Sequence, residues 1–301
     1  MEIFLNEVPK RRKVYLRNEE GKRYTLPAFY DKEDVTGEIA ISLTSKKFDH
    51  SGIKIELLGL IECAEGQPSQ FISLSKEISP PSTLTNQVNK FKFSFANVEK
   101  QFETFHGNDS RVKYILRAII KTTLRTLTWE REFGVVNPIS KNILNENNEP
   151  IKMEVGIEDW LHLSFNLDKS KFSTKDCITG KVEFKKVSMK LKNMLIQIIR
   201  KETTIGQYED SDVICRYEIM DGAPVKNETV PIRFFLSPYE LTPTYENVNN
   251  KFAVQHSINL VLYDSNDKRY FKQHEIWLYR IPRISPEREK ERLKEMMEGK
   301  K

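Results

Sequence analysis

The side chains with the greatest capacity for chemistry in this chain are five histidines and three cysteines. The histidines stand at positions 50, 106, 162, 256 and 274, and no two fall within one helical turn, so zinc-binding spacings such as HExxH are absent. The cysteines at positions 63, 177 and 215 form no CxxC pair, and their odd number argues against a disulfide framework. We expect a free, buried thiol at each cysteine. The spacing predicts no metal site.

Motifs for nucleophilic catalysis, phosphate binding and acid–base catalysis are also missing from the sequence. No GxSxG elbow and no GxGxxG occurs, and the three Gly-Lys pairs lack the earlier glycine of a P-loop. Acidic residues are dense on strand-like segments, where they usually form a solvated face; an acid pair brought together by folding is the alternative. His162 and His256 alternate with apolar neighbours and are expected to point to solvent. The sequence predicts no catalytic residue and no cofactor.

Charge and hydropathy restrict the partners and the location of the chain. The 301 residues carry 48 Lys and Arg against 43 Asp and Glu, and a net charge of +5 is too small for the broad basic face of a nucleic-acid-binding protein. No apolar run reaches the roughly 18 residues that cross a bilayer, and residues 1–13 lack the apolar core of a secretory signal. Together with the low cysteine content, these features predict a cytosolic protein.

The dominant hydrophobic period along the chain is two, which is typical of half-buried β-strands. Apolar and polar residues alternate over residues 53–57, 91–95, 112–120, 161–167 and 258–262. Segments rich in Gly, Pro, Asn and Asp separate these runs and supply turns. Amphipathic helical patterns are scarce. The pattern therefore predicts an all-β fold of antiparallel strands packed as sandwiches.

An internal repeat indicates two copies of one sandwich. Aligning Gly37 of "DVTGEI" with Gly180 of "CITGKV" gives an offset of 143 residues, and the same offset places Ile53 on Ile196 in the following strand. We interpret each glycine as the residue that lets a strand begin directly out of a tight turn.

The repeat and the length predict two domains and a tail. We divide the chain into an N-terminal sandwich over residues 1–140 and a C-terminal sandwich over residues 151–281, with the seam in the polar segment 137–150. Residues 282–301 are dense in Glu, Lys and Arg and are expected to be solvated, either flexible or marginally helical.

One apolar pair stands beside a turn signal. Ile219 and Met220 come directly before Asp221-Gly222-Ala223-Pro224, which favours a turn and places the pair at a loop tip. Either the pair folds back into its own core, or it is an exposed anchor for a protein partner, held ready by the turn. In the second case, its replacement would leave the stability nearly unchanged.

Four long segments identify a family. The segments are "VEKQFETFHGNDSRVKYILRAIIKT" (98–122), "IKMEVGIEDWLHLSF" (151–165), "YEIMDGAPVKNETVPIRFFL" (217–236) and "NVNNKFAVQHSINLVLYDSNDKRYFKQHEIWLYR" (247–280). They resemble the arrestin-like vacuolar protein sorting 26 family, whose members are subunits of the retromer complex. The resemblance runs from about residue 2 to residue 280. It implies two tandem arrestin-type β-sandwich domains.

The resemblance also implies a non-enzymatic adaptor. Retromer is a cytosolic coat on endosomes that retrieves transmembrane cargo towards the Golgi or the cell surface. The family subunit binds an α-solenoid scaffold subunit of the vacuolar protein sorting 35 type. It captures the cytosolic tails of transmembrane cargo together with sorting nexins. We therefore expect a cytoplasmic protein that is peripherally associated with the endosome membrane, with indirect membrane contact and no nucleic-acid partner.

Two sets of site residues follow from the resemblance. The family's scaffold-binding loop matches "IMDGAP", which assigns Ile219, Met220, Asp221, Gly222 and Pro224 to scaffold binding and favours the exposed-anchor interpretation.

The second set concerns cargo and sorting nexins. The family pairs an extended cargo tail with an edge strand that matches "KMEVGIE" here. Val155 matches a residue of the pocket for the cargo side chain, and Phe271 matches its aromatic wall. Ordinary core positions for these two residues are the alternative.

Two other classes of protein compete with this interpretation. An α-arrestin-type trafficking adaptor would carry PPxY motifs, but the Pro80-Pro81 pair is followed by Ser82 and Thr83. A β-sandwich hydrolase or glycan-binding enzyme would need a buried carboxylate cluster in a cleft, and nothing in the sequence indicates one.

Overall fold

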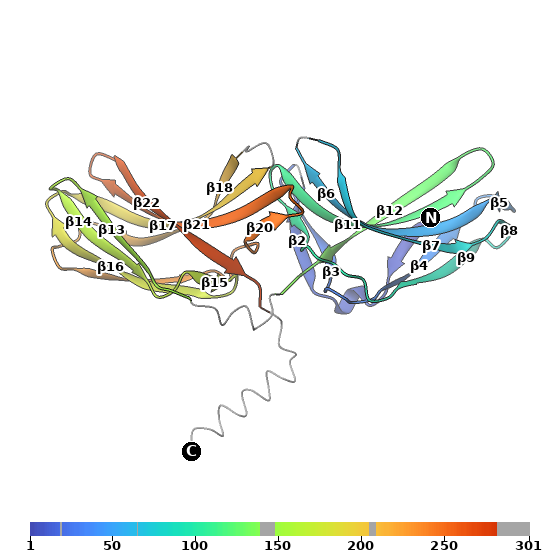
Figure 1. Cartoon of the computed structure of the whole chain (residues 1–301), viewed down its shortest axis with the longest axis horizontal. Coiled ribbons are helices and arrows are strands. Elements are labelled where there is room, and N and C mark those ends of the chain that lie inside the picture. The colour runs from blue at the N-terminus through green and yellow to red at the C-terminus, as the bar shows by residue number, and fades with distance from the viewer. Residues whose placement is uncertain (19, 65, 139–147, 205–208, 282–301) are drawn as a thin grey trace, which may run out of the picture. The chain divides into compact units, whose positions relative to one another are not determined.

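The computed structural model describes residues 1–18, 20–64, 66–138, 148–204 and 209–281 (Figure 1). Nearly all regular structure in this part of the chain is β-strand, and one short 3-10 turn, η1 (Val8–Lys10), is the exception. The prediction of an all-β, arrestin-type fold is confirmed. The predicted tail 282–301 and most of the predicted seam lie outside the described residues.

The chain divides into two compact units that are not continuous in sequence. Unit 1 contains residues 1–137, 200–212 and 245–255, and unit 2 is formed by the described residues of 138–199, 213–244 and 256–281. The boundary between the units therefore falls inside several strands rather than at one point of the chain.

Unit 1 is built on one small and one large sheet, with a short two-stranded sheet of β5 and β8. Its strands are β1 (Glu2–Leu5), β2 (Lys13–Arg17), β3 (Arg23–Phe29), β4 (Val35–Ser42), β5 (Phe48–His50), β6 (Gly52–Cys63), β7 (Ser69–Ser79), β8 (Ser82–Leu84), β9 (Val88–Phe95), β10 (Phe105–His106), β11 (Ser110–Lys121) and β12 (Thr126–Val135). The small sheet has the order β1-β4-β9, and the large one the order β2-β3-β12-β11-β6-β7, with β10 paired to β11.

The second half of the chain supplies another pair of sheets. Its strands are β13 (Ile151–Ile157), β14 (Leu161–Leu167), β15 (Lys171–Ser173), β16 (Cys177–Val187), β17 (Leu191–Thr204), β18 (Glu209–Asp221), β19 (Thr229–Phe235), β20 (Tyr245–Val248), β21 (Phe252–Asp264) and β22 (Arg269–Tyr279). The orders are β13-β14-β16-β19 and β15-β22-β21-β17-β18, with β20 paired to β21.

The alternation read from the sequence builds one apolar core in each unit. On β4, every second residue from Val35 to Ile41 is buried, and on β14 the core residues include Leu161, Leu163 and Phe165. The core of unit 1 also contains three residues from late in the chain, Val248, Phe252 and Val254. The Phe252 ring stacks on the ring of Phe105, with their centroids 5.6 Å apart. The core of unit 1 is therefore completed by residues some 150 positions beyond Phe105.

The strand orders support the internal repeat. The run β12-β11-β6-β7 corresponds to β22-β21-β17-β18, and β4-β9 corresponds to β16-β19. Each half also contains one short parallel pairing with its last long strand, β3 with β12 and β15 with β22. Ile53 and Ile196, aligned by the repeat, are both fully or almost fully buried.

The two aligned glycines have the same role in each half, but not the predicted one. Gly37 lies inside β4 and Gly180 inside β16, rather than at the exit of a tight turn. A Cβ at Gly37 would stand 2.1 Å from the backbone oxygen of Phe4, and a Cβ at Gly180 would stand 2.1 Å from that of Asn166. Glycine is needed because the neighbouring strand's backbone comes too close for any side chain.

Candidate functional site

The segment expected to receive an added strand lies at the edge of its sheet. Strand β13 is the terminal strand in the order β13-β14-β16-β19, and its pairing runs from Ile151 opposite Leu167 to Ile157 opposite Leu161. Among the described strands, β14 alone pairs with it. A terminal strand presents backbone N–H and C=O groups on its outer side, which an extended peptide can pair with.

The side chains of β13 alternate between core and solvent. Ile151, Met153 and Val155 face the core, whereas Lys152 and Glu154 are exposed. Val155 is 7% exposed and packs in the apolar core of unit 2. A peptide laid along β13 would therefore meet its backbone and its polar side chains before it met Val155.

The exposed face of β13 carries a small charged cluster. The Glu154 carboxylate lies 2.8 Å from Lys185 Nζ and 2.9 Å from His162 Nε2. The hydrogen bond from Lys185 is the main reason that the pKa of Glu154 lies below its ordinary value. The position of His162 at the surface agrees with the sequence prediction.

Phe271, the predicted aromatic wall, is on the exposed surface of strand β22. Its side chain is 61% exposed, and it stands opposite Val261 of β21 in the register. The guanidinium carbon of Arg269 lies 5.3 Å from the centre of the Phe271 ring. Val155 and Phe271 therefore lie on different sheets of unit 2, one buried and one available to a partner.

Ile219 and Met220 do not lie at a loop tip, and that prediction is wrong. Both lie near the C-terminal end of strand β18, which continues to Asp221. Each side chain is half-buried and packs against the core of unit 2. The strand extends this far because the ladder between β17 and β18 continues to its end, where Gly222 N donates to Lys192 O at 2.7 Å. Substitution of the pair must therefore also reduce stability.

The turn after this pair has a fixed conformation. Gly222 has a φ of +104°, a region that favours glycine. Pro224 is buried, and the Glu228 carboxylate accepts a hydrogen bond from Val225 N at 2.7 Å. The exposed residues at this turn are Asp221, Gly222, Ala223, Val225, Lys226 and Asn227. The turn presents a rigid surface to which the half-buried pair adds an apolar border.

Comparison with known proteins places this arrangement in a family. The family described as Vacuolar protein sorting-associated protein 26 matches residues 1–267. Vacuolar protein sorting-associated protein 26B of Mus musculus is 44% identical over 287 residues, which cover 93% of this chain and 84% of the relative. The protein of the same name from Homo sapiens has the same identity and coverage. The one from Danio rerio is 43% identical and covers 93% of this chain and 86% of the relative.

This chain belongs to the vacuolar protein sorting-associated protein 26 family. The family resemblance noted in the sequence is thereby confirmed. The relatives are named for protein sorting, and the assignment agrees with the all-β fold.

Unit 1 also contains a buried charged network that no sequence motif indicates. The Glu202 carboxylate, 3% exposed, accepts hydrogen bonds from Asn108 N at 3.1 Å and from Asp109 N at 3.4 Å. Arg200 Nη2 lies 3.1 Å from this carboxylate and 3.1 Å from that of Asp212. Burial raises the pKa of Glu202, against the opposing effect of Arg200. The network fixes the loop between β10 and β11 in this family member.

Other predictions about single residues have mixed outcomes. His256 is 1% exposed and contacts Thr244 Oγ1 through Nδ1 at 3.0 Å, so the prediction that it points to solvent is wrong. It lies on β21, which has neighbours on both sides and is buried on both faces around this position. Cys215 is buried as expected, whereas Cys63 and Cys177 are half-buried.

The described residues contain neither a candidate metal site nor a candidate membrane-spanning helix. Within those residues, no group of three or more His, Cys, Asp or Glu side chains is arranged to hold a metal ion. No helix there has the length and apolar character needed to span a bilayer.

Proposed function

We propose that this chain is a non-enzymatic adaptor subunit of retromer that takes part in sorting transmembrane cargo at endosomes. The observation that carries this proposal is the family match over residues 1–267. The proposal includes peripheral, indirect association with the endosome membrane from the cytoplasmic side. In this proposal, residues 1–140 form the N-terminal sandwich domain and residues 151–281 form the C-terminal one.

We propose that the cargo tail binds as an added strand on β13. The open edge of β13 supports this mode, because main-chain hydrogen bonds bind any extended tail regardless of its sequence. The exposed ring of Phe271 supports a role as an apolar contact for the cargo or for the sorting nexin that holds it. Val155, on the core-facing side of β13, would set the shape of the strand from within the core.

We propose that the end of β18 and the following turn bind the α-solenoid scaffold subunit. Ile219 and Met220 would supply apolar contact area at the border of the turn, and Asp221, Gly222 and Pro224 would fix its shape. The rigid turn supports this role, because a surface that is ordered before binding loses less conformational entropy on association.

The scaffold proposal is tested by co-elution with the purified scaffold subunit. We expect replacement of Ile219 and Met220 by alanine to weaken the complex at least tenfold. Because the pair packs against the core, the variant needs a control with a similar stability loss. Ile214 lies on the same strand and is also half-buried against the core of unit 2. Ile214→Ala should lower the melting temperature but retain the complex. Equal binding by all three proteins would reject the assignment.

The cargo proposal is tested with a fluorescent cargo-tail peptide in the presence of a sorting nexin. We expect Phe271→Ala to weaken peptide binding about tenfold and to leave scaffold binding unchanged. Phe235→Ala is a matched control, because Phe235 is 53% exposed and also has an arginine, Arg233, over its ring at 5.9 Å. If the Phe235 variant lost cargo binding as strongly as the Phe271 variant, the effect would not be specific to β22.

A further inference from the structure

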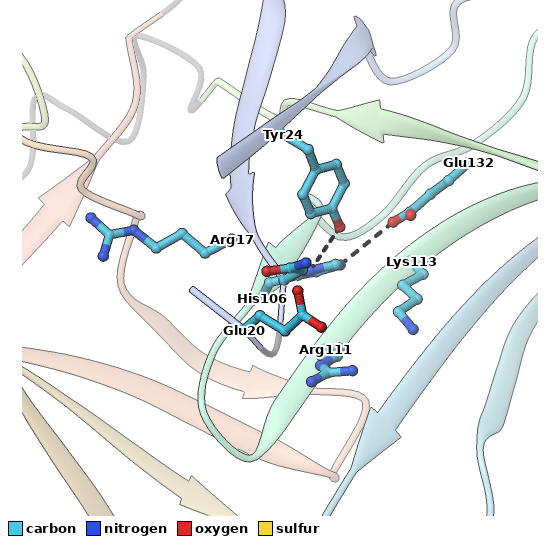
Figure 2. Close-up of a pocket in the computed structure, with 8 residues that line it drawn as sticks. Arg17, Glu20, Tyr24, His106, Arg111, Lys113 and Glu132 are labelled. Atoms are coloured by element: carbon cyan, nitrogen blue, oxygen red, sulfur yellow. Dashed lines mark hydrogen bonds and ion pairs between the residues drawn. The ribbon is translucent and has the colours of Figure 1, made fainter. Parts of the chain in front are cut away.

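Unit 1 contains a polar cavity of about 260 Å³ that has no role in the proposed partner-binding function. The eight residues that line it come from five separate stretches of unit 1: Arg17, Asn18, Glu20, Tyr24, His106, Arg111, Lys113 and Glu132. Figure 2 shows the side chains of Tyr24, His106 and Glu132 meeting on one side of it, with the charged ends of Lys113 and Arg111 nearby.

Strand pairing explains why these residues meet. Arg111 and Lys113 are two positions apart on β11, so they share a face, and Arg111 stands opposite His106 of β10. Glu132 of β12 stands opposite Ile115, which shares the β11 face of Arg111 and Lys113. The alternate residues Val112 and Tyr114 are fully buried in the core. The cavity therefore lies on the polar face of the large sheet.

The cavity contains two buried polar atoms that lack hydrogen-bond partners within the described part of the chain. The His106 side chain is 8% exposed, and its Nδ1 contacts the Tyr24 hydroxyl at 3.1 Å. Its Nε2 faces Glu132 Oε1 at 3.5 Å, an ion pair when the ring is protonated, and neither of these two atoms has a hydrogen-bond partner among the residues that the structure describes. Burial raises the pKa of Tyr24 to about 12, so this hydroxyl keeps its proton at neutral pH and can donate to Nδ1.

These groups make complementary demands on a ligand. A ring that accepts at Nδ1 carries its proton on Nε2, where it can donate to a ligand oxygen. Glu132 Oε1 can only accept, so it needs a donor such as a hydroxyl group. Arg17, Arg111 and Lys113 favour an anion, and Lys113 Nζ also lies 2.7 Å from Glu62 Oε2. Arginine and lysine are the usual phosphate ligands in proteins. One molecule that meets all three demands has both a phosphate and neighbouring hydroxyl groups.

We propose that this cavity binds a phosphorylated polyol, such as an inositol or hexose phosphate, either free or as the headgroup of a phosphorylated lipid. The phosphate contacts Arg17, Arg111 and Lys113, and the ring hydroxyls donate to Glu132 and Glu20. The carboxylates, which would repel inorganic phosphate, thereby become the groups that select a polyol. The volume suits one substituted six-membered ring, because it lies below the roughly 300 Å³ at which sites for larger ligands begin.

The first experiment is calorimetric titration of the full chain with inositol 1-phosphate, inorganic phosphate and unphosphorylated inositol. We expect inositol 1-phosphate to bind most tightly, with an affinity that falls as salt is added. Arg17→Gln and Lys113→Gln should each weaken its binding about tenfold, because each removes a charge-assisted hydrogen bond. Lys47→Gln, at an exposed lysine that does not line the cavity, is the matched control and should have no effect.

The carboxylate supplies the more specific test. Glu132→Gln should weaken the binding of inositol 1-phosphate, because it replaces one charged acceptor oxygen by an NH2 group that can only donate. It should strengthen the binding of inorganic phosphate, because it removes a negative charge. Glu20→Gln should change both affinities in the same directions as Glu132→Gln. Because Glu20 is exposed, its substitution should not disturb folding, so the same result in both variants excludes a folding defect as the cause.

A flotation assay separates the two sources of the ligand. Vesicles with and without phosphatidylinositol 3-phosphate are compared, and recruitment that Lys113→Gln abolishes would identify the lipid headgroup. Binding of the free compound without recruitment would identify a soluble metabolite. The proposal is overturned by the absence of saturable binding, by binding that the Arg17 and Lys113 variants leave unchanged, or by binding of a phosphopeptide in place of the polyol phosphates.

Discussion

The two units use the same strand order but differ at one edge of the smaller sheet. In unit 1, β4 is covered on one side by β1, a strand of four residues that ends the sheet. In unit 2, the corresponding β16 is covered by β14, which itself carries the seven-residue strand β13. The core and its close backbone contacts are common to both units, whereas the outer strand is not. An edge can therefore gain a strand while the core that supports it stays the same.

The units also differ in the polar groups that they bury. Unit 1 encloses ionisable side chains, among them Lys100 and Glu202. The buried polar contacts of unit 2 are mainly neutral, such as the hydrogen bond from Asn259 Nδ2 to Gln197 Oε1 at 3.1 Å. Because buried charges respond to pH and to the loss of a partner more strongly than amides do, unit 1 should be the more sensitive unit.

The largest expected effect tests the shared backbone contact. Gly37→Ala and Gly180→Ala each introduce a methyl group 2.1 Å from a backbone oxygen, so a neighbouring strand must move. We expect each to lower the free energy of unfolding by at least about 3 kcal/mol. Urea unfolding followed by fluorescence measures this, with Trp129 in unit 1 and Trp160 and Trp277 in unit 2.

A third glycine provides the control. Gly156 lies on the edge strand β13, and a Cβ there would meet no atom within 4 Å. Gly156→Ala should be neutral or stabilise slightly, because alanine reduces the freedom of the unfolded chain. If Gly180→Ala were as mild as Gly156→Ala, the correspondence between the two halves would be an accident of alignment.

The second effect tests the difference in buried charge. Lys100 is fully buried, and its Nζ donates to Glu33 O at 2.7 Å and to Val98 O at 2.8 Å. Lys100→Met should destabilise unit 1 by about 2 kcal/mol, because both carbonyls lose their donor. In unit 2, Gln197→Leu removes one neutral acceptor and should cost about 1 kcal/mol. Urea unfolding measures both losses. An equal loss of unfolding free energy in the two variants would contradict the greater sensitivity expected of unit 1.

The third effect is a pH dependence. Burial raises the pKa of Glu202 above its ordinary value of 4.5, so the folded state binds the proton more tightly than the unfolded state does. The folded state then holds more protons between the two pKa values, and the free energy of unfolding falls as the pH rises through that window. Glu202→Gln should flatten this slope for the Trp129 signal as the pH rises above 4.5. Parallel slopes for the two proteins would show that another group is responsible.

The smallest effect concerns the edge strand. Glu154 and Lys185 form a surface ion pair on the outer face of β13 and β16. Because such pairs contribute little in water, Glu154→Gln should leave the free energy of unfolding almost unchanged. The same substitution is expected to alter cargo-peptide binding more than stability, since it lies on the strand proposed to receive the peptide. Fluorescence titration of the peptide alongside urea unfolding separates the two effects.

Much of the fold could be predicted from alternation and from the repeat. Val35 to Ile41 and Leu161 to Leu167 alternate because one face of each strand meets the core, and this periodicity is visible in the sequence. The repeat identifies Gly37 and Gly180 as equivalent positions, but it does not show why glycine is required there. A close approach between two backbones depends on which strand lies alongside, and sequence does not show that.

The errors at His256 and at the Ile219–Met220 pair have related causes. Alternation of apolar and polar residues predicts a strand with one solvent-exposed face. The residues near His256 on β21 are instead buried on both faces, because this strand is central in its sheet. The Asp-Gly signal correctly marks a turn, yet the preceding ladder continues up to Asp221, so the pair belongs to the strand. The cavity around His106 could not be predicted at all, because its residues meet only through strand pairing.

The late residues in the core of unit 1 have a consequence for synthesis. The ring of Phe105 is covered by Phe252, and Val254 belongs to the same core. A ribosome that has released residues 1–137 has therefore released an N-terminal unit with part of its apolar surface still open. Unit 1 can close only after residue 254 has emerged, so the chain must keep this surface protected through more than a hundred further additions.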